Sequence, residues 1–221
     1  MVAAKPLLAA ALIGLVSTST ALAAIVDAPT VRITPADQAK ARAALLRTTD
    51  FGAGWGGGPI KTSQLSPPNC PGFDPKESDL VVTGHADAIF IFRQLGVELD
   101  QDVQVLANEA AVQTDFDRSV SPQLGRCLAY QLARVPAVTD VSITRIPFPP
   151  VGTVSAVYRA DMVVSRHGHS VHWITDYVFF GEGRTEYELT VVAPAGTGDQ
   201  LARFEAELAQ ILVHRAGAEP A

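Results

Sequence analysis

The strongest constraint on the fold comes from residues 153–194, where apolar and polar side chains alternate through three consecutive stretches. Alternation with a period of two is typical of β-strands. In the first two stretches, one face of each strand is apolar: Val154, Ala156, Tyr158, Ala160, Met162 and Val164, then Val171, Trp173, Tyr177 and Phe179. A turn centred on His167-Gly168 brings these faces to the same side of a sheet, because it pairs Val164 with Val171 and Tyr158 with Tyr177.

A second turn follows at Gly181-Glu182-Gly183, where a three-residue hairpin loop is predicted. This loop places three residues of the second strand opposite residues of the third: Phe179 with Thr185, Tyr177 with Tyr187, and Trp173 with Val191. The sequence therefore predicts a C-terminal antiparallel meander of three strands.

The rest of the chain supplies helices around this meander. Apolar residues recur at three- and four-residue steps before and after it, which is typical of amphipathic helices. The predicted elements in chain order are a helix from Thr34-Pro35 to Arg47, a Gly/Pro-rich loop over 51–75, a strand over 79–92, an acidic turn over 98–102, a helix over 108–134 divided at Pro122, a strand near 139–148 and a helix over 199–214. This order predicts an α+β fold, in which helices pack on an antiparallel sheet.

The N-terminus has the pattern of a secretory signal peptide. Lys5 precedes an apolar run that ends in the small-residue motif Ala21-Leu22-Ala23, so cleavage is expected after Ala23. The apolar run is shorter than the roughly 20 residues that span a bilayer. We therefore expect a secreted or extracytoplasmic protein, associated with the cell envelope, with residues 24–221 as a single domain and no transmembrane segment in the mature chain.

Charge and cysteine content support this compartment and exclude one class of partner. The formal net charge is −6, and losing Lys5 makes it −7, so the basic surface of nucleic-acid-binding proteins is missing. The two cysteines, Cys70 and Cys127, form an even pair, which predicts a disulfide in an oxidising compartment. A metal site or a reactive thiol is the alternative, but neither cysteine has a histidine or a second cysteine beside it.

Three of the five histidines lie in the stretch SRHGHSVHW, at residues 165–173. In the predicted hairpin, His167 and His169 lie at an exposed turn, and His172 points away from Trp173. The rings do not converge, and no carboxylate completes a tetrahedral set, so we predict no metal there and no cofactor. The motifs of nucleophile-elbow hydrolases and of zinc proteases are also missing from the sequence.

The polar face of the meander holds the candidate ligand-binding residues. The predicted register places Arg159 opposite Asp176, and Asp176 opposite Glu188. An exposed sheet face with one cross-strand ion pair explains these charges without any function. If helices partly cover that face, Arg159, Asp176 and Glu188 would instead form the polar floor of a ligand site.

Several stretches resemble a known group of proteins: the Asp50–Trp55 segment DFGAGW, Cys70 downstream of it, the helix cysteine in GRCLAY, and the strand-turn-strand VFFGEGRTEYELTVV. In element order the chain resembles secreted actinobacterial sensor-like domains, including the extracellular sensor domains of receptor serine/threonine kinases, and more loosely the PsbP-like α/β sandwich. The kinase sensors usually carry a second disulfide, which two cysteines cannot form. The resemblance implies a stand-alone exported binding domain and transfers no functional residues.

Two classes of function follow. The first is a non-catalytic domain that binds an unknown small molecule or envelope partner. The alternative is a small secreted hydrolase that uses carboxylates with His85 and Asp87, which share one face of the predicted strand 79–92. A concave pocket that unites His85, Asp87 and Asp176 would favour the enzyme, whereas an open groove without perturbed acids would favour binding.

Overall fold

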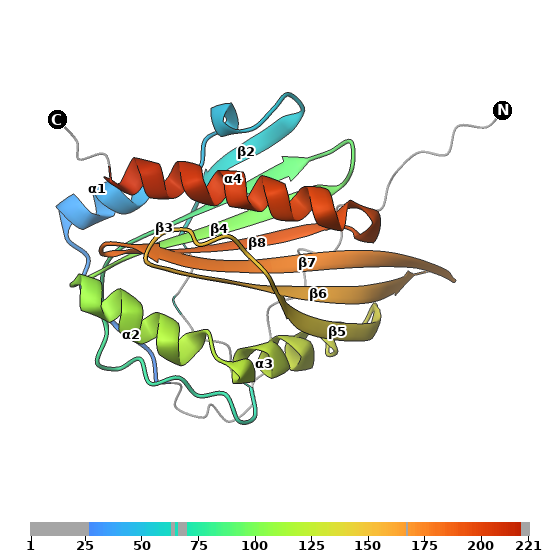
Figure 1. Cartoon of the computed structure of the whole chain (residues 1–221), viewed down its shortest axis with the longest axis horizontal. Coiled ribbons are helices and arrows are strands. Elements are labelled where there is room, and N and C mark those ends of the chain that lie inside the picture. The colour runs from blue at the N-terminus through green and yellow to red at the C-terminus, as the bar shows by residue number, and fades with distance from the viewer. Residues whose placement is uncertain (1–26, 63–64, 66–69, 167, 218–221) are drawn as a thin grey trace.

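The fold is α+β, with one mixed, mostly antiparallel sheet of eight strands and helices on both of its faces (Figure 1). The computed structural model describes residues 27–62, 65, 70–166 and 168–217. The strands are β1 Thr30–Val31, β2 Trp55–Ile60, β3 Val81–Phe92, β4 Val97–Leu106, β5 Val138–Ile146, β6 Val154–Arg166, β7 His169–Glu182 and β8 Thr185–Pro194. The α-helices are α1 Pro35–Ala43, α2 Glu109–Ser119, α3 Pro122–Leu132 and α4 Gly198–Gly217.

The strand order is β1-β3-β4-β8-β7-β6-β5, and β2 also pairs with β3. Most of this sheet consists of two antiparallel units, the β3–β4 hairpin and the meander β5–β8, which join where β4 pairs with β8. Beside β3, β1 adds a parallel strand and β2 an antiparallel one. The predicted C-terminal meander is therefore confirmed, and β5 extends it by a fourth strand.

Helices cover both faces of the sheet, whereas many antiparallel sheets leave one face exposed to solvent. Helices α1 and α4 lie along one face, and α2 and α3 lie along the other (Figure 1). The first face carries the main core, which includes Phe90, Leu99, Val178 and Leu189. On the second face, smaller clusters pack under α2 and α3. Each strand of the sheet centre therefore buries side chains on both sides.

The predicted register is correct for the first hairpin and wrong for the second. Val164 pairs with Val171, Tyr158 with Tyr177, and Arg159 with Asp176, as predicted. In the second hairpin, Glu182 pairs with Thr185, so the turn has two residues and the pairing is displaced by three. Gly183 adopts a φ of 57°, which suits this tight turn.

The displaced pairing overturns the three predicted contacts between β7 and β8. Tyr187 lies opposite Phe180 rather than Tyr177, and Val191 lies opposite Asp176 rather than Trp173. The physical reason is that both faces of these strands are buried. A displacement by an odd number of residues exchanges the two faces of the strand. When both faces are buried, this exchange costs little free energy, so the apolar pattern does not specify the register.

Two segments predicted as irregular form strands instead. The residues of the expected acidic turn over 98–102 belong to β4, and the turn lies at Arg93–Gly96. The Gly/Pro-rich loop contains β2, which pairs with β3 from Trp55 opposite Phe92 to Ile60 opposite Asp87. Glycines at the centre of β2 weakened the sequence pattern of a strand.

The strand predicted over 79–92 begins at Val81, and a β-bulge between Val82 and Gly84 changes its side-chain alternation. Val82 therefore packs with Leu106 on the α2 side, whereas Ala86 packs in the main core. The single apolar face predicted for this strand is correct only beyond the bulge. Gly84 has a second role, because a Cβ atom there would lie 2.2 Å from the carbonyl oxygen of Asp37 in α1.

Helix α1 begins at the predicted residues but ends at Ala43 rather than at the predicted Arg47, and a separate short 3₁₀ helix follows at Thr48–Asp50. Thr34 caps α1, since its hydroxyl accepts a hydrogen bond from the backbone N–H of Asp37 at 3.1 Å, and Pro35 occupies the first helical position. Pro122 divides the long apolar stretch into α2 and α3, as predicted. These two helices are thus set at the angle that lets both follow the same face of the sheet (Figure 1).

The predicted disulfide between Cys70 and Cys127 is formed, with a Cα–Cα distance of 5.3 Å. It ties the segment after β2 to the buried side of α3, and both cysteines are buried. The predicted signal peptide over residues 1–23 lies outside the described residues. No described helix combines the length and the apolar composition needed to cross a bilayer.

Removing this disulfide is expected to lower the free energy of unfolding by about 2–4 kcal/mol, because the unfolded chain regains the freedom of a long closed loop. The test is urea denaturation of the Cys70→Ser/Cys127→Ser variant against the oxidised parent. Mass spectrometry of the parent without reductant should recover a peptide that links the two cysteines. Two free thiols, or an unchanged denaturation midpoint in the variant, would contradict the prediction.

Candidate binding cavity

A cavity of about 700 Å³ lies between the sheet and the helices α2 and α3. Part of its wall is apolar, with Phe73, Phe116, Leu124, Leu128 and Phe179 among its residues. Seven acidic residues also line it: Glu77, Asp87, Asp100, Asp102, Asp115, Glu186 and Glu188. No lysine or arginine occurs among the described lining residues. The cavity lining is therefore strongly acidic and partly apolar.

Strand alternation explains why so many carboxylates point to one side. In β4 and β8 most residues at every second position are apolar and enter the main core, as Leu99 and Leu189 do. The residues between them face α2 and α3. Across the ladder, Asp87 of β3 lies opposite Asp102 of β4, and Asp102 lies opposite Glu188 of β8. Three strands thus present a row of carboxylates to the cavity.

Burial and mutual repulsion make these carboxyl groups hold their protons. Burial, with a contribution from Asp102, raises the pKa of Glu188 to about 7. Burial, with Glu98 and Asp87 nearby, raises the pKa of Asp100 to about 6. A carboxylate in a low-dielectric site beside like charges is costly, and neutralisation relieves that cost. The cavity therefore binds protons near neutral pH, where exposed carboxyls do not.

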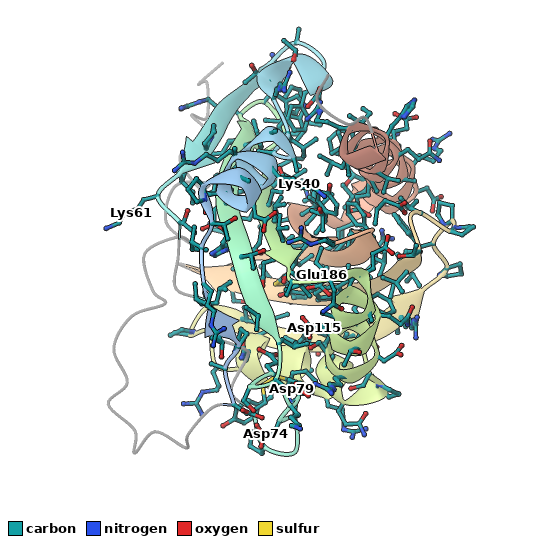
Figure 2. All side chains as sticks on the ribbon, turned by 90° about the vertical axis from the view of Figure 1, so that its left-hand side faces the viewer. Lys40, Lys61, Asp74, Asp79, Asp115 and Glu186 are labelled. Carbon is teal, nitrogen blue, oxygen red and sulfur yellow. A yellow bond between two sulfur atoms is a disulfide. The ribbon has the colours of Figure 1, made fainter. Side chains whose placement is uncertain are left out.

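A second acidic group lies beside α2, where side chains from three chain segments meet. Burial raises the pKa of Glu186 well above its usual value, and Asp115 and Glu77 raise it further. Burial likewise raises the pKa of Glu77 to about 8, with Asp115 contributing. Figure 2 shows Glu186 and Asp115 on the same side of the molecule, with Asp79 and Asp74 further down that side. At the surface Asp79 is paired with Arg118 and Lys76, so the excess of acidic charge is at the cavity.

His85 lies beside the cavity and is held between two carboxylates. Its Nε2 atom is 2.6 Å from Oδ2 of Asp102 and 3.2 Å from Oδ1 of Asp87. Burial lowers the pKa of His85, but the hydrogen bonds to Asp102 and Asp87 outweigh burial and raise it to about 9. The side chain of Gln38 bonds to both the backbone N–H and the backbone carbonyl of His85, which fixes this part of β3 against α1.

The structure brings together two of the three predicted ligand-binding residues and separates the third. Nε of Arg159 donates to Oδ1 of Asp176 at 2.7 Å, and a second bond joins the same two side chains. Because of the displaced register, Glu188 lies on the other face of the sheet, opposite Phe179, and lines the cavity. The predicted three-residue floor is therefore not formed.

The face that carries Arg159 and Asp176 is covered by α4. Asp176 is 0 % exposed, and Arg159 also donates to the backbone carbonyl of Gly198 at the start of α4. Glu205 of α4 is fully buried nearby. The expectation of an exposed or partly covered polar face is wrong here, because the chain that follows the meander returns over it as a helix.

The histidine-rich stretch does not contribute to the cavity. His169 and His172 are exposed near the end of the β6–β7 hairpin, and His167 lies outside the described residues. His85 and Asp87 do share a face, as the alternation predicted, but Asp176 lies on the opposite one. The pocket is therefore concave and contains carboxyl groups with raised pKa values, but Asp176, the residue expected beside His85 and Asp87, is not part of it.

Sequence reasoning missed Asp100, Asp102, Glu186 and most of the cavity. The information was present as alternation: V-E-L-D-Q-D-V-Q-V in β4 and T-E-Y-E-L-T-V-V in β8 place acids at every second position. A strand with acids on one face is ordinarily read as solvent-exposed on that face. Only the position of α2 and α3 reveals that these acids are covered.

The fold and the cavity define an α+β domain with an acidic, partly apolar cavity beneath two helices. Comparison with known proteins adds no narrower class, since no family model and no curated protein matches the sequence significantly.

Proposed function

We propose that the chain is a non-catalytic, extracytoplasmic binding domain whose cavity takes a small molecule with a cationic group on an apolar body. The observation that carries the proposal is the cavity of about 700 Å³ with seven acidic residues in its lining. This volume lies in the range of small-molecule sites, which reach roughly 300–1,000 Å³. The disulfide and the signal-peptide pattern support an oxidising compartment.

The charge of the ligand follows from the free-energy cost of keeping several carboxylates close together in an empty cavity. Buried carboxylates that repel one another bind protons at neutral pH, and a cationic group can replace those protons at lower cost. An amine or quaternary ammonium ion would be attracted, whereas a carboxylate or phosphate would be repelled. The apolar wall, with Phe116 and Phe179, suits a hydrocarbon or aromatic body attached to that cation.

The hydrolase alternative receives less support from the same geometry. At neutral pH a histidine whose pKa is about 9 is charged, so it does not act as a general base. Its Nε2 atom contacts two carboxylates rather than the hydroxyl or thiol of a nucleophile. The resemblance to secreted sensor-like domains also favours a binding role.

The test is calorimetric titration with 2-phenylethylammonium at neutral pH, with phenylacetate as the matched anion. We expect the cation to bind with proton release, seen as a dependence of the heat on the buffer, and the anion not to bind. Asp115→Asn should weaken binding at least about fivefold, which corresponds to about 1 kcal/mol. Asp117→Asn is the matched control, because Asp117 belongs to the same helix but does not line the cavity.

Two results would overturn the proposal. One is equal binding of the cation and the anion, which would mean that charge does not select the ligand. The other is an equal effect of the two asparagine substitutions, which would place the binding site outside the cavity.

A further inference from the structure

We infer that His85, Asp87 and Asp102 form a site for one divalent transition-metal ion in the wall of the cavity. The three residues come from the facing strands β3 and β4, where Asp87 and Asp102 are direct cross-strand partners and His85 is two positions along the same face. Each offers one ligand atom, and these atoms all lie within 4.8 Å of one another. The inference concerns an ion rather than an organic molecule, so it does not depend on the proposed function.

The donor atoms suit such an ion in kind and in spacing. An imidazole nitrogen with two carboxylate oxygens is a donor set for Zn²⁺ or Mn²⁺, whereas Ca²⁺ and Mg²⁺ prefer oxygen alone. Ligand atoms at about 2.1 Å from a tetrahedral zinc ion are roughly 3.4 Å apart. The Nε2 atom of His85 lies 2.6 Å and 3.2 Å from the two carboxylate oxygens, so small side-chain rotations would open the required space.

The site lies in a part of the wall that is shielded from water, since His85 is 5 % and Asp87 is 6 % exposed. Shielding from water strengthens the attraction between a divalent ion and the two carboxylates. No lysine or arginine among the described lining residues competes with the ion for these oxygens.

Neighbouring groups hold the ligands in place, as expected for a metal site. Nε2 of Gln104 donates to Oδ1 of Asp102 at 3.3 Å, which leaves Oδ2 directed at His85. Gln38 fixes the backbone on both sides of His85. Such supporting hydrogen bonds orient the side chains that bind the metal directly, and they tune the metal affinity. Because Asp87 and Asp102 line the cavity, an ion can enter from it, and water or Glu188 can complete the coordination.

The experiment is a calorimetric titration of the chelator-treated, full-length chain with ZnCl₂ and MnCl₂, and metal content is measured after dialysis. We expect about one equivalent of ion, with MgCl₂ and CaCl₂ at least about tenfold weaker. His85→Asn should weaken Zn²⁺ binding at least about tenfold. Asp100→Asn is the matched control, because Asp100 lines the cavity and lies on the same strand as Asp102 but outside the three-residue group. It should change the affinity less than threefold.

Asp102→Asn is the second variant, in case His85→Asn does not fold, because asparagine keeps a hydrogen-bonding oxygen in the place of the carboxylate. A stoichiometric site that survives either substitution would overturn the inference, as would the absence of binding in the parent. Equal affinity for Mg²⁺ and Zn²⁺ would also overturn it, since the acids would then act without the imidazole. Loss of zinc binding does not affect the proposal for an organic cation, which Asp115→Asn tests separately.

Discussion

Replacing Arg159 with alanine is expected to lower the free energy of unfolding by about 3–5 kcal/mol, which is the cost of leaving a buried charge without its partner. Asp176 is 0 % exposed, and Arg159 is its bidentate partner beneath α4. The alanine variant would leave this carboxylate without a partner, next to Glu205. Burial and Asp176 raise the pKa of Glu205 far above its usual range, and Arg159 alone lowers it. Thermal and urea denaturation followed by circular dichroism measure the loss.

Two comparisons separate loss of charge pairing from loss of side-chain packing. In Arg159→Met/Asp176→Asn, no charge remains and the volumes are kept, so most of the stability should return. Arg118→Ala is the exposed counterpart, because Arg118 also makes two hydrogen bonds to one aspartate, Asp79, but at the surface. Its melting temperature should stay close to that of the parent. A similar loss in Arg118→Ala and Arg159→Ala would show that burial of the pair is not what matters.

The contrast between the two β-hairpins shows which part of the fold the sequence could predict. The turn at Gly168 aligned long apolar runs on one face, and this register is correct in every pair, including Arg159 with Asp176. At Gly183 the same reasoning failed by three residues. Tyr187 and Glu188 each have a buried environment on their own side of the sheet. Neither the predicted nor the observed pairing of β7 with β8 therefore exposes an apolar face, and the sequence pattern could not distinguish them.

The candidate cavity was harder to predict than the fold because it depends on what covers the sheet. His85 and Asp87 could be placed on one face from β3 alone. Their encounter with Asp102 depends on β4 pairing in one particular register, and the residues around Asp102 looked like a turn. Elevated pKa values arise from burial, and burial of a strand face by distant helices has no local signature in the sequence.

The protein is expected to become less stable as the pH rises from 5 to 8, contrary to ordinary acid denaturation. Burial raises the pKa of Glu77 to about 8 and those of Glu186 and Glu205 well above their usual values. In the unfolded chain these carboxyls release their protons near pH 4.5. Between pH 4.5 and their folded-state values the native protein binds more protons than the unfolded one, so the free energy of unfolding falls as the pH rises.

The size of this fall can be bounded from proton binding. Over three pH units, one such group changes the free energy of unfolding by up to about 4 kcal/mol. Hydration and relaxation reduce this value, so we expect about 3 kcal/mol in total and a melting temperature lower by roughly 6–12 °C at pH 8 than at pH 5. The measurement is calorimetry across this range with a chelator present, so that bound metal does not contribute.

Substitution in α4 identifies the responsible groups, because two glutamates of that helix differ in burial. Glu205 is fully buried, and both of its oxygens lack a hydrogen-bond donor when it is ionised. With its proton bound it can donate to Asp176. Glu205→Gln keeps a donor and cannot ionise, so it should flatten the pH dependence, whereas Glu207→Gln, at an exposed position, should not. Stability that rises from pH 5 to pH 8 would show that these carboxyls are ionised in the native state, and that the cavity and the α4 interface are far better hydrated than their burial implies.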